Sequence, residues 1–172
     1  MLLLYEVKNN MEIPQLFQEE IDEFLLKARN SERRRALKIL HGPGAELNRT
    51  INFMMSDTYL QPHNHPPEEG KEKIERYKIL GGQLAIVFFN DKGNVTKAVI
   101  LDEKSDVYAV NPSEWHTPIV LSEYALCYEE VKGVYDQTHY KQMAEWAPKE
   151  NTLEVPAYLN FLKKEVLRLS SG

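Results

Sequence analysis

The sequence predicts a mainly β domain, either a barrel or a double-sheet jelly roll, with one helix before it and one after it. Two observations lead to this prediction. Short runs rich in β-branched and aromatic residues alternate with turn signals through the middle of the chain. Near each end, apolar residues recur instead at the spacing of an amphipathic helix. With 172 residues, the chain is long enough for one such domain with terminal additions.

The chain divides into three predicted sections: an N-terminal helical and basic extension over residues 1–43, a β-barrel over 44–133, and a C-terminal extension with a helix over 134–172. The first helix is expected over about residues 14–28, with Pro14 in the first turn, where a helix tolerates it. The apolar positions that predict the second helix are Tyr158, Leu159, Leu162, Val166 and Leu169.

Eight strands are expected in the middle section. Glycine and asparagine turn signals separate them at Gly81-Gly82 and Asn111–Ser113, and the Gly-containing loop 90–94 predicts a hairpin. The predicted strands are Arg49–Met55, Tyr59–His65, Arg76–Leu80, Gln83–Phe89, Val95–Leu101, Val107–Val110, Thr117–Leu121 and Ala125–Lys132.

Charge and composition exclude several classes of protein. A formal net charge of -5 argues against nonspecific nucleic-acid binding. No segment approaches the roughly 20 apolar residues of a membrane span, and the first residues do not resemble a signal peptide. The single cysteine, Cys127, cannot form an internal disulfide and is expected to be inert core rather than a nucleophile. We therefore expect a cytoplasmic protein with neither nucleic acid nor membrane as partner.

Three histidines and one glutamate predict a metal site. His63 and His65 are two residues apart, so in a strand both side chains lie on one face, while Glu75 and His116 belong to later strands. Imidazole nitrogens and a carboxylate oxygen suit one divalent ion such as Zn, Fe, Mn, Ni or Co. Four protein ligands would leave positions open on a five- or six-coordinate ion. The alternative is that these are ordinary loop or core histidines.

The spacing of these residues resembles the motifs of the cupin superfamily. The motifs are His63-Asn-His65, then Glu75 with six residues before Gly82, then a proline-containing turn that leads to His116. The resemblance implies a cupin-type double-stranded β-helix, which is a jelly-roll barrel. The gap between His65 and Glu75 is longer than usual in that superfamily, so a glutamate of the 66–73 loop is an alternative carboxylate ligand. The distance from Glu75 to Gly82 favours Glu75.

Several short segments further resemble the WbuC family of cupin-fold metalloproteins, over about residues 25–148. That resemblance implies a metal site and a setting in bacterial surface-polysaccharide (O-antigen) biosynthesis, without defining a reaction. The segments that carry it are Arg29–Arg35, His41, Arg49–Asn52, Tyr59–His65, Trp115-His116, Glu130–Asp136 and Trp146–Pro148.

Candidate catalytic residues follow from strand parity. Tyr59 shares the parity of His63, and Tyr77 shares the face of Glu75, so each is either a hydrogen-bond donor near the ion or a plain core aromatic. Glu130 and Lys132 form an acid/base pair if they point into the barrel, and are solvated charges if they point outward.

Candidate substrate-binding residues are Gln61, Tyr135 at the rim, and Arg33 and Arg35. The arginines form either a solvated basic face or a clamp for phosphate or carboxylate, and the WbuC resemblance favours the clamp. His41 is expected to be loop structure or, less favoured, part of the pocket lining. His139 is expected on the surface.

We expect a metal-binding protein that acts on a small carbohydrate-type or sugar-phosphate ligand, as an isomerase or epimerase. Two alternatives stay open: a non-catalytic sugar-binding module, and an Fe(II) dioxygenase. A homodimer formed through edge strands and terminal helices is also expected.

Overall fold

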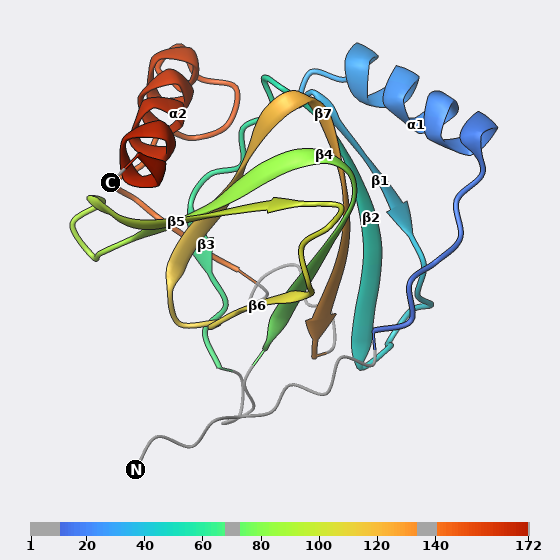
Figure 1. The fold of residues 1–172 in the computed structure, drawn as a ribbon. Coiled ribbons are helices and arrows are strands. Elements are labelled where there is room, and N and C mark those ends of the chain that lie inside the picture. The colour runs from blue at the N-terminus through green and yellow to red at the C-terminus, as the bar shows by residue number, and fades with distance from the viewer. Residues whose placement is uncertain (1–10, 68–72, 134–140, 172) are drawn as a thin grey trace.

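The computed structural model describes residues 11–67, 73–133 and 141–171, and confirms a mainly β protein with a helix at each end. Figure 1 shows a strongly curled antiparallel sheet, with α1 (Gln18–Asn30) and α2 (Val155–Ser170) on its outside. The strands are β1 (Arg35–Ile39), β2 (Leu47–Met55), β3 (His63–Asn64), β4 (Glu75–Phe89), β5 (Val95–Asp102), β6 (Tyr108–Val110), β7 (Trp115–Lys132) and β8 (Gln142–Met143).

The two long strands of the sheet, β4 and β7, pair antiparallel along most of their lengths. Each joins two runs that the sequence analysis kept apart. Gly81-Gly82 is therefore a bulge inside β4, with shifts in register on both sides, rather than a turn between strands. Gly82 has φ +73°, and a Cβ there would lie 2.1 Å from the carbonyl oxygen of Tyr124. Only glycine fits this bend.

The predicted hairpin between β4 and β5 is confirmed, with the loop at 90–94. Two other strand predictions differ from the structure. The run Tyr59–His65 contributes only the two-residue β3, which pairs with both β7 and β8. β1 was not expected, because it lies in the segment assigned to the N-terminal extension. It pairs with β2, so the end of the arginine-rich segment is part of the sheet.

The inner face of the sheet is divided into an apolar half and a polar half. Buried side chains of β4, β5 and β7 fill the apolar half, among them Ile86, Phe88, Leu101 and Val120. The polar half holds the predicted metal-binding residues. A domain that fills one half of its interior with apolar side chains keeps a stable core while the other half stays available for a ligand.

Each helix covers part of the outer face. The ring of Phe24 on α1 stacks on Phe53 of β2 with 4.8 Å between centroids. α1 begins later than predicted because Phe17 is still in extended conformation. The predicted second helix is confirmed, and its Leu162 packs in a cluster with Ile119 of β7. Neither helix is long and apolar enough to cross a membrane, and the described residues contain no other candidate.

Candidate metal centre and ligand pocket

The structure brings His63, His65, Glu75 and His116 together at the polar end of the interior. One ligand atom from each lies within 4.8 Å of the others, and all four side chains are buried. β3 supplies His63, the residue after β3 supplies His65, and β4 supplies Glu75. His116 on β7 lies directly opposite His63 in the strand pairing. Short local spacing and one strand pairing therefore assemble the cluster.

Backbone carbonyls orient two of the imidazole rings. Nδ1 of His63 donates to the carbonyl oxygen of Gln61 at 3.0 Å, and Nδ1 of His116 donates to that of Glu114 at 2.9 Å. In His63, whose Nε2 has no hydrogen-bond partner among the described residues, this bond leaves Nε2 without a proton when the ring is neutral. Hydrogen bonds of this kind are typical of metal-binding histidines, because they hold the ring and the tautomer in place.

Glu75 sits among these rings. Its Oε2 lies 3.0 Å from Nε2 of His65 and 2.8 Å from Nε2 of His116. Burial alone would raise the pKa of Glu75, but the hydrogen bonds from His116 and His65 hold it well below its usual range. Burial also lowers the pKa of His63 well below its usual value, which favours the neutral ring that binds metal.

The cluster fits a divalent metal ion. Within the described part of the chain, Nε2 of His63 and Oε1 of Glu75 are buried and have no hydrogen-bond partner. Such orphaned atoms are costly unless a ligand satisfies them. Two atoms bound to one ion at about 2.1 Å can lie at most about 4.2 Å apart, so the observed spread is close to what coordination requires. The donor set of three nitrogens and one oxygen suits Zn, Fe, Mn, Ni and Co alike.

A cavity of about 610 Å³ opens beside the cluster, and His63 belongs to both. β1 and β2 form one wall, with Leu37 and Ile39 on the first and Asn48, Thr50 and Asn52 on the second. The remaining lining residues are Arg33, Arg35, His41, Leu60, Gln61, Glu129, Lys141, Met143 and Glu150. The wall is thus part apolar and part charged, as in sites that bind small polar molecules.

The acid that faces the cavity is Glu129 and not its neighbour Glu130. Glu129 accepts a hydrogen bond from Nδ2 of Asn52 at 3.1 Å. Burial, followed by the charge of Glu75, raises the pKa of Glu129 to about 8. Glu130 lies on the opposite face of β7, where it pairs with Arg76 and accepts from the hydroxyl of Tyr128 at 2.9 Å. Of the two orientations that the sequence left open for Glu130, the structure has the one that points away from the cavity, but the side chain is buried in an ion pair rather than solvated.

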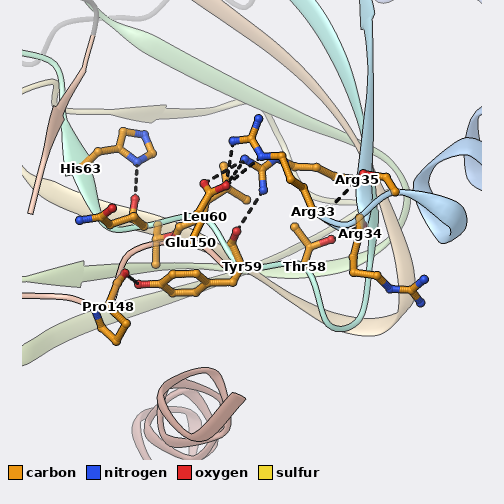
Figure 2. A network of polar contacts seen from close by, with 12 residues as sticks. Arg33, Arg34, Arg35, Thr58, Tyr59, Leu60, His63, Pro148 and Glu150 are labelled. Carbon is orange, nitrogen blue, oxygen red and sulfur yellow. Dashed lines mark hydrogen bonds and ion pairs between the residues drawn. The ribbon is translucent and has the colours of Figure 1, made fainter. Parts of the chain in front are cut away.

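The other candidate catalytic residues have different positions. Tyr77 lies beside Glu75 and is buried. Burial and the charge of that carboxylate raise the pKa of the Tyr77 phenol well above its usual value. Tyr59 turns away from the cavity, since its hydroxyl donates to the carbonyl oxygen of Pro148 at 2.7 Å (Figure 2). Lys132 is exposed at the end of β7. The structure brings Tyr77 to the cluster, and leaves Tyr59 and Lys132 away from it.

The candidate substrate-binding residues mostly reach the cavity. Arg33, Arg35 and Gln61 line it, and Gln61 is held by a hydrogen bond from its Nε2 to the carbonyl oxygen of Ala144 at 2.8 Å. His41 also lines the cavity, while its Nδ1 accepts from the backbone N–H of Arg49 at 3.0 Å. Tyr135 and His139 lie outside the described residues.

Glu129 and Glu150, the two acidic residues of the pocket lining, were not predicted from the sequence. Glu129 was overlooked because its neighbour Glu130 has the same chemistry. Glu150 could not be recognised, since it precedes the second helix in a segment without strand periodicity and reaches the cavity only in the folded chain. Cys127 is fully buried in the apolar half of the interior.

The fold and the site together define a cupin-type jelly-roll protein with a cluster of three histidines and one glutamate that could hold a metal ion. The chain belongs to the family described as a domain of unknown function (DUF6016), whose model matches residues 16–101. The matched segment includes His63, His65 and Glu75 but ends before His116.

Solved structures share this fold at low sequence identity. Protein SO0799 from Shewanella oneidensis is 11% identical with a TM-score of 0.56, and the alignment covers 86% of this chain and 95% of that one. CapF, solved with the inhibitor 3-isopropenyl-tropolone, is 12% identical with a TM-score of 0.53. That alignment covers 63% of this chain, which spans only 31% of the length of CapF. No protein of curated function matches the sequence.

Proposed function

We propose that this protein is a metal-dependent cupin that binds a small anionic, carbohydrate-type ligand in the cavity and isomerises or epimerises it. One observation carries the proposal: His63 belongs to the buried four-residue cluster and also lines the cavity, and its Nε2 has no hydrogen-bond partner among the described residues. A ligand in the cavity would therefore lie next to a bound ion. The surface-polysaccharide setting rests on the resemblance to the WbuC family.

Two pairs of side chains and a bound ion would contact different parts of the ligand. Arg33 and Arg35 at the mouth would bind a phosphate or carboxylate of the ligand. Leu37 and Ile39 on β1 would pack against the apolar face of a sugar ring. A bound divalent ion would polarise a ligand oxygen as a Lewis acid, or support oxygen chemistry if it were Fe(II).

Glu129 is the residue that we propose as the proton acceptor. It replaces Glu130 in that role because it lies on the cavity wall, while Asn52 holds its carboxylate by a hydrogen bond. An isomerase of this type moves a proton from a carbon next to a carbonyl, and a carboxylate within reach of that carbon can accept it. Tyr77, beside Glu75, would hold the neighbouring carboxylate rather than contact the ligand.

Solvent deuterium exchange tests the proposal directly. Protein loaded in turn with each of the five candidate ions is incubated in D₂O with fructose 6-phosphate and other ketose and aldose phosphates, and the carbon-bound protons are followed by NMR. We expect deuterium at the carbon next to the carbonyl with wild type and with Glu130→Gln. We expect none with Glu129→Gln or with His63→Ala/His116→Ala.

The outcome also separates the alternatives. Binding of a sugar phosphate without exchange under any of the ions would favour the non-catalytic sugar-binding module. Oxygen consumption that depends on Fe(II) and on the ligand would favour the dioxygenase. Absence of both binding and exchange would contradict a carbohydrate-type ligand. The homodimer and the cytoplasmic location remain predictions of the sequence.

A further inference from the structure

Three consecutive arginines, of which Arg33 and Arg35 line the cavity, point in two directions (Figure 2). Nε of Arg33 lies 2.9 Å from Oε2 of Glu150, and Nη2 of Arg35 lies 2.9 Å and 3.0 Å from Oε1 and Oε2 of the same residue. Nη1 of Arg35 also donates to the carbonyl oxygen of Tyr59 at 3.0 Å. Arg34 turns the other way, and its Nε lies 2.9 Å from both carboxylate oxygens of Asp57.

The backbone at Arg34 holds this arrangement. Arg34 has φ +55°, a conformation that is unfavourable for a long side chain. Its N–H donates to the carbonyl oxygen of Ser31 at 2.9 Å, and its own carbonyl oxygen accepts from the N–H of Met55 at 3.0 Å. A strained residue fixed from both sides keeps Arg33 and Arg35 aimed at the same point.

That point suits an oxyanion. Three cationic side chains line the cavity, Arg33, Arg35 and Lys141, against two carboxylates, Glu129 and Glu150. This local excess of positive charge occurs in a chain whose formal net charge is -5. Two guanidinium groups converging on two oxygens of one carboxylate form the geometry that also binds phosphates and carboxylates of ligands.

The side chain of Glu150 can leave without moving its segment, because other contacts hold the backbone around it. The carbonyl oxygen of Pro148 accepts from the hydroxyl of Tyr59, and Oγ1 of Thr152 donates to the carbonyl oxygen of Lys149 at 3.0 Å. Asn151 takes a turn conformation with φ +63°, which asparagine tolerates well. Rotation of the Glu150 side chain alone would uncover both arginines.

We propose that Glu150 is an internal competitor, occupying the oxyanion site of the cavity until the phosphate or carboxylate of a ligand displaces it. The inference rests on the proposed function, since it specifies how the ligand of that same cavity binds. The apparent dissociation constant of such a site is the intrinsic one divided by the fraction of molecules in which the side chain has left the site. Glu150 therefore sets a threshold of ligand concentration and selects for ligands with a strong anionic group.

The test compares Glu150→Gln with Asp57→Asn. Each variant removes one carboxylate from the same arginine triplet and changes the net charge equally, but Asp57 does not line the cavity. Calorimetric titrations use glucose 1-phosphate, glucuronate and glucose on metal-loaded protein. We expect Glu150→Gln to bind the two anions at least about tenfold more tightly than wild type, which corresponds to about one charge-assisted hydrogen bond. Comparison of the two anions shows whether phosphate or carboxylate is the preferred group.

The control variants are not expected to bind the anions more tightly than wild type. Asp57→Asn is expected to bind as wild type does, within about twofold. Arg35→Met is expected to lose the binding of both anions, and the affinity for glucose should stay the same in every variant. Thermal unfolding monitored by circular dichroism establishes that each variant is folded.

Other outcomes would overturn the inference. Equal or weaker anion binding by a folded Glu150→Gln variant would show that Glu150 is a permanent tether between β1 and the segment before α2. Anion binding that is equal in wild type and Glu150→Gln, but lost in Arg35→Met, would leave the proposed ligand class intact and exclude the competitor. If no variant binds any of the three probes although the metal is present, both the inference and the proposed ligand class fail.

Discussion

Two polar clusters, each with a buried carboxylate, lie on opposite faces of the same two strands. The inner cluster contains Glu75 of β4 and Glu129 of β7, and the outer one contains Arg76 and Glu130, the next residue on each strand. Glu75 and Glu130 are buried, whereas Arg76 and Glu129 are half-buried. The two clusters differ in whether the chain supplies a hydrogen-bond partner for both oxygens of the buried carboxylate.

In the outer cluster, both oxygens of the Glu130 carboxylate have a hydrogen-bond partner. Arg76 pairs with Glu130, whose second oxygen accepts from the hydroxyl of Tyr128 at 2.9 Å. Arg76 and Tyr128 thus each contact one oxygen of the Glu130 carboxylate, so this buried carboxylate has its partners without a ligand.

The inner cluster leaves two buried polar atoms without a partner. Glu75 lies among the imidazole rings, and the charges of Glu75 and Lys141 both act on Glu129. Within the described residues, Oε1 of Glu75 and Nε2 of His63 have no hydrogen-bond partner. Natural interiors rarely tolerate such groups unless a ligand satisfies them. The difference between the clusters is thus a physical criterion that separates a structural polar group from a binding site.

The largest expected effect is the loss of metal from His63→Ala/His116→Ala. Wild type purified without added metal or chelator should contain about one equivalent of a divalent ion by elemental analysis, and the double variant almost none. Glu130→Gln, which alters only the outer cluster, should keep the ion. An equal metal content in all three proteins would remove the distinction between the clusters.

Removal of the ion should have the next largest effect, because binding to the folded state alone stabilises it. An ion present at 100 times its dissociation constant contributes about 2.7 kcal/mol, which corresponds to a change in Tm of about 5–10 °C for a chain of this length. Scanning calorimetry before and after chelation measures this shift. The double variant should show no shift, and a shift of equal size there would place the stabilising ion elsewhere.

Glu130→Gln should lower the free energy of unfolding by about 2 kcal/mol. Breaking a buried ion pair costs about 3–5 kcal/mol, and the estimate is reduced because the side chain of Arg76 is 22% exposed. Urea denaturation measures the change. An unaltered stability would mean that the outer cluster is not the structural member of the pair.

Glu129→Gln should have the smallest effect on stability, within about 1 kcal/mol in the metal-free protein. With a pKa of about 8, Glu129 is mostly protonated at neutral pH, so glutamine replaces an uncharged side chain of similar shape and keeps an oxygen for the hydrogen bond from Asn52. The same urea experiment as for Glu130→Gln gives a matched pair of values. A loss as large as that of Glu130→Gln would show that Glu129 has a structural role.

The four-residue cluster could be predicted from the sequence because its spacing resembles the motifs of the cupin superfamily. His63 and His65 are two residues apart, and Glu75 and His116 each lie at the start of a strand, so spacing and strand parity brought them together in the prediction. The second helix was predicted for a similar reason, since its apolar positions follow one period within a single element.

Positions that depend on register or on distant segments were harder to predict. Choosing between Glu129 and Glu130 required the register of β7, and a shift of one residue reverses the face of a strand. Gly81-Gly82 reads as a turn in the sequence, yet its bulge lets β4 continue around the barrel.

The sequence by itself determined the fold class, the two helices and the four residues of the metal cluster, because periodicity and short spacing encode them. Only the tertiary structure decided which glutamate faces the cavity, and that Glu150 meets Arg33 and Arg35 across more than a hundred residues of chain. Such a contact leaves no local pattern. It arises when the sheet curls and brings the edge strand β1 beside the segment before α2, where opposite charges then pair.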